Sequence, residues 1–265
     1  MTFKRLLLTG AAGALGRELR PRLKRHCELL RLSDIADLGT AGTGEELVPA
    51  ALERADAVLR LLDGVDAVVH LGGISVEGPF EPILQANIVG VYNLYEAARQ
   101  QRVQRIVFAS SNHVTGFYRQ DEVIDPRAPM RPDGYYGISK AFGENLSRFY
   151  FDRYGIETVC LRIGSSFPEP KDRRMLATWL SYDDLERLVV ASLTAPVVGH
   201  SVVYGMSDNT TTWWDNTSAA HLGYRPKDSS EPFRAAAEAR QPALDRSDPT
   251  VVYQGGGFVT KGPYG

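Results

Sequence analysis

The sequence predicts an α/β fold with a doubly wound parallel sheet, and three observations lead to this prediction. Apolar runs of strand length alternate with helical patterns along most of the chain. The first strand leads directly into a glycine-rich turn and a helix. The length of 265 residues is enough for one such domain with a large core.

Composition and charge exclude several classes of function. The formal net charge is −2, which gives no indication of a nucleic-acid surface. No apolar run approaches the roughly 18 residues of a membrane span, and the start at Met1 lacks the layout of a signal peptide. Cys27 and Cys160 lie far apart without metal-ligand spacing. We therefore expect a reducing, cytoplasmic location and no metal.

The first pair of elements has the pattern of a dinucleotide site. An apolar strand at 5–9 is followed by Gly10, Gly13 and Gly16 and by a helical pattern over 15–24. The first glycine can adopt the unusual backbone angles of a tight turn, and the second lets main-chain N–H groups approach phosphate oxygens. The third lets the helix pack close to the strand. Because a helix N-terminus attracts anions, this stretch predicts a bound pyrophosphate.

The remaining elements continue the alternation. The second strand, 28–33, ends at Asp34, where an acidic side chain accepts hydrogen bonds from an adenosine ribose and favours NAD over NADP. The later strands are expected at 47–52, 66–71, 105–109, 158–163 and 201–204. The later helices are expected at 55–62, 80–101, 135–154, 182–194 and 213–222, and loops at 35–46, 125–133, 168–174 and from 242 onward.

Small and polar residues follow the strands at the edge where a ligand is expected. Gly72 and Gly73 follow the fourth strand, and they would let a cofactor lie across its end. Ser75, Asn112, His113 and Ser165 are polar residues at strand ends. A pocket with so many donors and acceptors suits a polyhydroxylated molecule.

Tyr136 and Lys140 form the pattern Tyr-x-x-x-Lys within the expected helix 135–154. Residues at this spacing lie one helical turn apart on the same face. A free phenol has a pKa near 10 and is a poor base at neutral pH. A neighbouring ammonium favours the phenolate and lowers that pKa, so the pair predicts a catalytic base.

Together these motifs resemble the extended short-chain dehydrogenase/reductase family over residues 4 to about 165. The resemblance implies a seven-stranded Rossmann sheet in a single domain over 1–265, with 165–265 contributing a small substrate cap and tail. It also implies a Ser–Tyr–Lys catalytic group, in which alignment at Val114 makes Ser111 the serine, whereas Thr115 replaces a usual tyrosine.

The same resemblance implies a set of cofactor contacts. Ala51 stands where the family commonly has an adenine-binding aspartate, so adenine recognition would rest on the main chain near Leu52. Asn87 matches a structural asparagine of the family. The expected NAD-binding residues are Gly10, Ala12, Gly13, Ala14, Leu15, Gly16, Asp34, Ile35, Leu52, Leu71, Gly72, Gly73, Asn87, Tyr136, Lys140 and Ile163.

At closer range the chain resembles the uronate-oxidising members of this family, through SSNH at 110–113 and RMLATW at 174–179 among other stretches. This implies oxidation of D-glucuronate or D-galacturonate at C1 to the aldarolactone. Tyr136 would act as the phenolate base, and Arg174 would hold the C6 carboxylate. The expected substrate-binding residues are Ser75, Ser111, Asn112, His113, Tyr136, Ser165 and Arg174.

Several alternatives remain open from the sequence. Arg173 neighbours Arg174 and could supply the carboxylate clamp instead. A sugar epimerase or dehydratase of the same fold would keep its nicotinamide bound through the cycle. A non-catalytic NAD-sensing protein would need the glycine turn but not the Tyr–Lys pair. By analogy with the family, the helices at 80–101 and 135–154 would pair between subunits of a homo-oligomer.

Overall fold

The computed structural model describes residues 3–241, 244–262 and 264, and its centre is a parallel sheet. The described strands lie in the order β3-β2-β1-β4-β5-β6-β7. They are β1 (Phe3–Thr9), β2 (Cys27–Ser33), β3 (Glu45–Leu47), β4 (Ala67–His70), β5 (Arg105–Ser111), β6 (Glu157–Ile163) and β7 (His200–Gly205). The order reverses between β1 and β4, which is where doubly wound sheets bind their ligands. The predicted fold class is confirmed.

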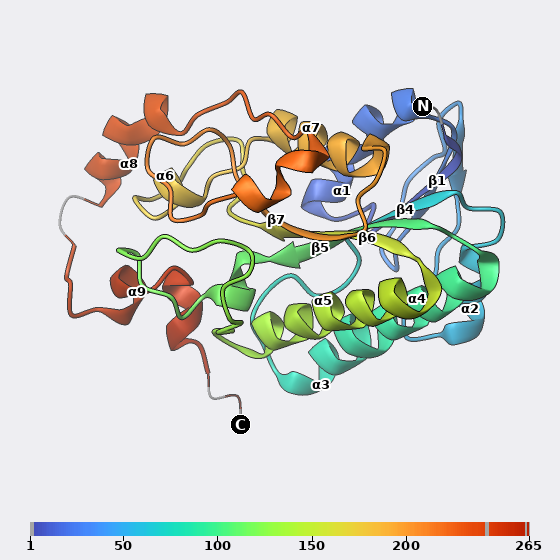
Figure 1. The fold of residues 1–265 in the computed structure, drawn as a ribbon, viewed down its shortest axis with the longest axis horizontal. Helices are drawn as coiled ribbons and strands as arrows, with labels where there is room; N and C mark the ends of the chain where they lie inside the picture. The colour runs from blue at the N-terminus through green and yellow to red at the C-terminus, as the bar shows by residue number, and fades with distance from the viewer. Residues whose placement is uncertain (1–2, 242–243, 263, 265) are drawn as a thin grey trace.

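Helices cover both faces of the sheet (Figure 1). Leu6 and Leu8 of β1 lie in one buried cluster with α1 (Ala14–Leu23) and α7 (Tyr182–Thr194). Between them, Leu7 points to the opposite face and joins a second cluster. That face is covered by α2 (Ala55–Leu61), α4 (Gly90–Gln101) and α5 (Tyr135–Tyr154). Each strand side chain therefore has an apolar layer to bury against, as both faces of a parallel sheet require.

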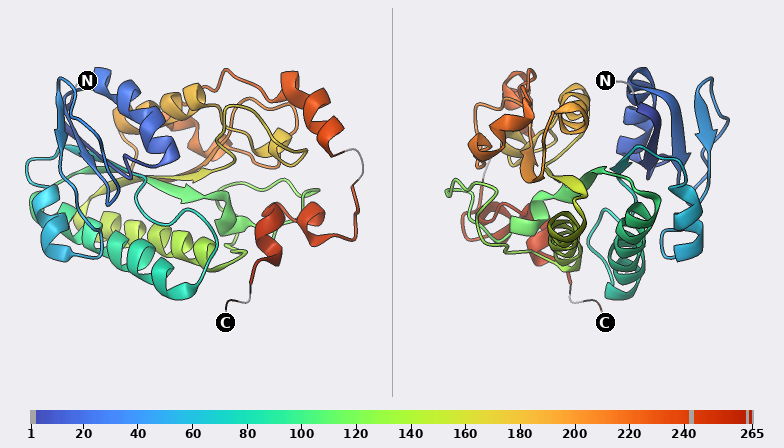
Figure 2. Two further views of the ribbon diagram at one scale, coloured as in Figure 1. Left: turned by 180° about the vertical axis from the view of Figure 1, so that it is seen from behind. Right: turned by 45° about the vertical axis from the view of Figure 1, so that its right-hand side comes forward.

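Shorter helical segments connect these layers or lie beyond them. A π-helical turn, η2 (Leu84–Val89), joins α3 (Phe80–Ile83) to α4. Figures 1 and 2 show α6 (Met175–Thr178), α8 (Arg234–Arg240) and α9 (Pro249–Val252) beyond the carboxyl ends of the strands. The remaining short segments are η1 (Lys24–His26), η3 (Asn112–Thr115), η4 (Thr217–Leu222), η5 (Glu231–Phe233) and η6 (Gly256–Thr260).

Two elements differ in the structure from their expected bounds. The third strand covers Glu45–Leu47 instead of 47–52. Val48 still donates to Leu32 O, but Pro49 has no N–H, so the ladder ends there. The helix expected over 213–222 is only the 3₁₀ segment Thr217–Leu222. Trp214 instead forms an isolated bridge with Ile124 and stacks its ring on Tyr204.

The C-terminal tail was also predicted wrongly, as loop. Asp248 caps α9 by accepting a hydrogen bond from the Thr250 amide at 2.8 Å, and η6 follows within a few residues. The first residues of the expected loop, 242–243, lie outside the described part of the chain. The tail packs back onto the carboxyl edge of the sheet, where Tyr253 bridges Arg119.

In the described residues, every helix is too short or too polar to cross a lipid bilayer. Cys27 and Cys160 are buried and form no disulfide. The cytoplasmic location expected from the two thiols stays a prediction, as does the assignment of 165–265 to a substrate cap. Part of that segment serves the core, since it supplies β7 and α7.

Candidate active site

The glycine turn after β1 has the shape of a phosphate cradle. Gly10 has φ +68°, and a Cβ there would lie 2.7 Å from the Leu71 carbonyl carbon. At Gly16 a Cβ would lie 2.1 Å from Gly10 O, so internal packing requires both glycines. At Gly13 a Cβ would meet only Gly10 O, at 3.2 Å. Its missing side chain mainly leaves the outer side of the turn open, which fits a closely approaching pyrophosphate.

Asp34 lies at the end of β2 and holds the same turn. Its Oδ2 accepts a hydrogen bond from the Ala12 amide, and its Oδ1 accepts one from the Ala36 amide, both at 3.0 Å. The Ala12 N–H is therefore used within the protein. Next to Asp34, the Ile35 side chain is 81 % exposed. This exposed apolar side chain beside an acidic strand end is compatible with the expected nucleoside site.

Asn87 anchors the loop that follows β4. Its Oδ1 accepts from the Ile74 amide at 2.7 Å, and its Nδ2 donates to Ile74 O and to Ser139 Oγ, both at 2.9 Å. Gly73 has φ +121°, and a Cβ there would lie 2.5 Å from Asn87 Oδ1. Both amide hydrogens of Asn87 are thus used inside the protein. The structure shows it as a residue that positions the Gly72–Gly73 loop against α5.

Tyr136, Lys140 and Ser111 come together at the start of α5 and the end of β5. Lys140 Nζ donates to Ala109 O at 2.8 Å and lies 5.7 Å from the centroid of the Tyr136 ring. Burial raises the pKa of Tyr136 to about 12, against an opposing effect of the Ser111 hydroxyl. Burial also lowers the pKa of Lys140 to about 8. Burial thus opposes the ionised phenol that the sequence argument expects in the reaction.

This opposition has a clear physical reason. The sequence argument counted the attraction between phenolate and ammonium but not the removal of both groups from water. Tyr136 and Lys140 are 7 % and 5 % exposed, so each group disfavours its charged form. The expected residues lie close together, and the ionised phenol stays a prediction for the reacting enzyme.

Glu77 is a site residue that the sequence reasoning missed. It is buried in the loop after β4, and its two carboxylate oxygens accept from the backbone amides of Tyr135 and Tyr136 at 3.0 and 2.8 Å. These N–H groups have no acceptor within α5, because they belong to its first turn. A Cβ at Gly134 would lie 2.3 Å from Glu77 Oε2, so the glycine makes room for the carboxylate. An acidic residue far from the helix in sequence gives no local signal of this role.

Arg174 reaches into the site from the loop after β6 and separates clearly from Arg173. Its Nε donates to Gln254 O at 2.6 Å and its Nη1 to Ser165 Oγ at 3.3 Å. With the Asn112 amide oriented to donate to Ile163 O, the Asn112 oxygen accepts from Arg174 Nη2 at 2.9 Å. All three partners are neutral.

Arg173, by contrast, pairs with Glu238 at 3.2 Å. Arg174 makes no ion pair with any described residue. A guanidinium carries five N–H donors, so one on each terminal nitrogen of Arg174 is left without a partner among the described residues. Burial lowers the pKa of this guanidinium. The geometry therefore favours Arg174 over Arg173 as an anion clamp.

His113 has two partners that sequence reasoning did not find. Its Nδ1 lies 2.7 Å from Asp133 Oδ2, and its ring stacks on Phe258 of the C-terminal tail with centroids 3.8 Å apart. The Phe258 ring is also 6.1 Å from that of Tyr136. Asp133 lies in a segment expected to be loop, and Phe258 in a tail expected to have no structure. Their roles depend on tertiary contacts that no local pattern shows.

The other predicted residues also lie at the carboxyl edge of the sheet. Ser75 is exposed on the loop after β4, and Ser165 follows β6 with its hydroxyl 2.9 Å from Thr178 Oγ1. Leu71 directly follows β4, and Ile163 is the last residue of β6. The Leu52 side chain packs beside Gly72, where a Cβ would lie 2.8 Å from its Cδ1. Ala14 and Leu15 begin α1 directly after the turn.

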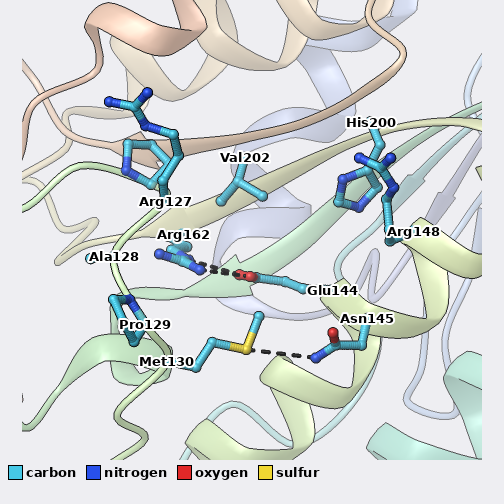
Figure 3. Close-up of a pocket in the computed structure, with 11 residues that line it drawn as sticks. Arg127, Ala128, Pro129, Met130, Glu144, Asn145, Arg148, Arg162, His200 and Val202 are labelled. Carbon is cyan, nitrogen blue, oxygen red and sulfur yellow. Dashed lines mark hydrogen bonds and ion pairs between the residues drawn. The ribbon is translucent and has the colours of Figure 1, made fainter.

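A separate pocket of about 330 Å³ lies between α5 and the loop at 126–130 (Figure 3). Arg162 and Glu144 meet in it at 2.8 Å and are both nearly fully buried. Arg127 and Arg148 at its rim pair with Asp125 and Asp152. None of the predicted site residues lines this pocket. Because each of its arginines already pairs with a carboxylate, the pocket offers no free arginine for an anionic ligand.

Comparison with known proteins decides the family. The sequence profile of the NAD dependent epimerase/dehydratase family matches residues 6–194. The chain belongs to this family. It is also 62 % identical to a uronate dehydrogenase from Pseudomonas putida, over 99 % of this chain and 98 % of that protein.

Solved structures agree with this family assignment. A glucuronic acid dehydrogenase from Chromohalobacter salexigens superimposes with a TM-score of 0.97 at 52 % identity, covering 98 % of both chains. A Y136A mutant of uronate dehydrogenase from Agrobacterium tumefaciens, complexed with NAD, superimposes with a TM-score of 0.96 at 53 % identity, also covering 98 % of both chains. The predictions of an NAD-dependent dehydrogenase and of NAD as its cofactor are confirmed.

Proposed function

We propose that this member of the epimerase/dehydratase family oxidises a hexuronic acid, D-glucuronate or D-galacturonate, at C1 to the aldarolactone. The observation that carries the proposal is that the guanidinium of Arg174 has neutral hydrogen-bond partners but no ion pair among the described residues. A partly buried cation without an anionic partner is costly to maintain in the free protein. The C6 carboxylate of a uronate would supply the missing charge and two acceptor oxygens. The names of the relatives support the same substrate class.

The cofactor contacts are proposed on the shape of the glycine turn and on the position of Asp34. NAD, when bound, supplies the hydride acceptor. Gly13 leaves room for the pyrophosphate, and Asp34 lies where a ribose is expected. Lys140 lies on the same side of α5 as Tyr136 and has its ammonium anchored to Ala109 O. The full set of sixteen contacts named from the resemblance remains part of this proposal.

In the proposed reaction, Tyr136 removes the proton from the anomeric hydroxyl. Its own pKa of about 12 means that the phenolate must be stabilised before it can act. Lys140, one helical turn away, provides the positive charge that does so. Ser111 donates a hydrogen bond to the sugar oxygen as that oxygen becomes a carbonyl. Arg174 holds the far end of the sugar, which fixes C1 rather than another carbon beside Tyr136.

The experiment is a substrate panel followed at 340 nm. We expect D-glucuronate and D-galacturonate to form free NADH with kcat/KM about 10²-fold or more above that of D-glucose and D-galactose, because the neutral hexoses leave Arg174 unpaired. Arg174→Ala should remove most of this preference through KM, whereas the matched variant Arg173→Ala should keep it. Equal oxidation of uronates and hexoses by the unaltered protein would refute the clamp. Conversion of a uronate without free NADH would instead indicate an epimerase or dehydratase.

A further inference from the structure

Asp133 has no assigned part in the site, yet it is among the most completely enclosed carboxylates near it. Its side chain is 0 % exposed. Oδ2 accepts from His113 at 2.7 Å, and Oδ1 is buried with no partner among the described residues. Buried carboxylates normally have all their oxygens satisfied, because an unpaired one costs free energy. The imidazole of His113 is the one side chain among the described residues that this carboxylate binds.

The surroundings hold this carboxylate in one place. A Cβ at Gly116 or at Gly255 would lie 1.9 Å from Asp133 Oδ2, so two glycines from different segments form its slot. Gly255 donates to Gly116 O at 2.8 Å, which closes the slot. On the other side, Phe258 stacks on the imidazole at 3.8 Å. The ring of His113 therefore has little freedom to turn away.

The protonation of His113 follows from these contacts. Burial lowers the pKa of the imidazole, against an opposing effect of Asp133. The other charged groups that act on it are Arg174, which lowers the pKa, and Glu77, which raises it. The neutral ring has one N–H, and a carboxylate can only accept. The hydrogen therefore lies on Nδ1, and Nε2 carries a lone pair.

Nε2 is the atom that remains available. It has no hydrogen bond to any described residue. Unlike Asp133 Oδ1, it is not fully buried, so a ligand can reach it. The imidazole lies beside Tyr136, with ring centroids 5.8 Å apart. Arg174 is also near enough for its charge to act on this imidazole. In the proposed function, an acceptor here would face the sugar beside Tyr136.

We infer that Asp133 is a positioning residue that fixes His113 in the Nδ1–H form, so that Nε2 accepts a hydrogen bond from one ring hydroxyl of the sugar. This inference rests on the proposed function for its substrate, but not for the state of the imidazole. It assigns His113 the selection of a hydroxyl, a task separate from that of Arg174. The opposite tautomer would present an N–H and lose the selection.

The first test needs no substrate. In the ¹⁵N NMR spectrum of the protein labelled at its five histidines, the His113 signal is assigned by its loss in His113→Gln. We expect the proton on Nδ1 in the unaltered protein. A proton on Nε2 would overturn the inference. This spectrum decides the question even if Asp133→Asn fails to fold or the protein oxidises no uronate, in which case only the proposed function fails.

The second test separates positioning from a merely structural role. Asp133→Asn can donate to Nδ1 and so favours the other tautomer, with Asp121→Asn as an exposed matched control. We expect kcat/KM for the preferred uronate to fall about 10-fold or more, mainly through KM, which is the scale of one lost hydrogen bond. The 2-, 3- and 4-deoxy analogues of the uronate are then compared with the uronate itself. With the unaltered protein, kcat/KM should be lower by a similar factor for one of the three analogues. With Asp133→Asn, the same analogue and the uronate should give the same kcat/KM. Equal losses on all substrates would contradict the inference.

Discussion

At the residue scale, the site is governed by the removal of charged groups from water. Tyr136 and Lys140 have pKa values of about 12 and about 8, and burial is the main cause of both shifts. Below pH 8 both groups carry their protons, so the pair contains no base. Above pH 8 the pair loses its first proton, mainly from Lys140. The phenolate beside the ammonium is then a minor form in equilibrium with the neutral phenol beside the neutral amine. The pair as a whole therefore titrates near pH 8.

The resemblance between the chain and its relatives could not have revealed this behaviour, because burial is a property of the folded protein. The same is true of Arg174 and Arg173. They are adjacent in sequence, but only the structure shows that Glu238 satisfies one of them and that neutral oxygens surround the other. The sequence indicates which residues are candidates for the site, whereas their charge states depend on the fold.

At the element scale, α5 carries the site because its first turn is held from outside. Glu77 binds the amides of Tyr135 and Tyr136, and it sits in the same loop as Ser75. The loop after β4 is thereby connected to the base itself. A shift of this loop would displace the backbone of Tyr136.

Glu77→Gln tests this connection. A glutamine has one acceptor oxygen in place of two, so one N–H of the first turn of α5 loses its partner. We expect a loss of about 1 kcal/mol in the free energy of unfolding and a lower kcat, with NAD affinity maintained. Urea unfolding and steady-state kinetics would measure both. Glu81→Gln, an exposed carboxylate on α3, is the control, and equal behaviour of the two variants would argue against the connection.

Elements with clear local signals could be predicted from sequence. The helices at Tyr135–Tyr154 and Tyr182–Thr194 both have the predicted bounds. Apolar residues at helical spacing define the second helix, whereas the first is bounded by the proline-rich loop before it and by Gly155, with φ 73°, after it. The tail could not be predicted in this way. The Gln254 main-chain oxygen accepts a hydrogen bond from Arg174, and its side-chain Oε1 accepts one from the Trp214 indole at 2.9 Å. These contacts form only when the chain has folded.

At the scale of the whole molecule, the sheet brings distant segments to one edge and buries polar groups beneath it. His70 at the end of β4 is 0 % exposed, and its Nδ1 lies 2.7 Å from Thr9 Oγ1. Burial lowers its pKa from 6.5 to about 3. The pairing of subunits through α4 and α5 stays a prediction, although Tyr92 and Phe149 on these helices are about half exposed.

Because His70 stays neutral in the fold, it makes the protein sensitive to acid. Below pH 6.5 the unfolded chain binds a proton that the folded one does not, so the free energy of unfolding falls as the pH falls from 6.5 towards 3. At pH 4.5 the loss from this group is about 3 kcal/mol. Urea unfolding at pH 7 and pH 4.5 should show a smaller difference for His70→Gln than for the unaltered protein or His221→Gln. The same pH dependence in all three would show that His70 is not responsible.

The most direct test of the account is the pH dependence of uronate oxidation with and without the phenol. For the unaltered protein, kcat/KM should rise with pH, about tenfold per unit, up to the pKa near 8 of the Tyr136–Lys140 pair and then level off. Tyr136→Phe should bind NAD normally, lose about 10²-fold or more in kcat, and lose this rise. A Tyr136→Phe enzyme with near-normal turnover and the same pH profile would contradict the assignment of Tyr136 as the base.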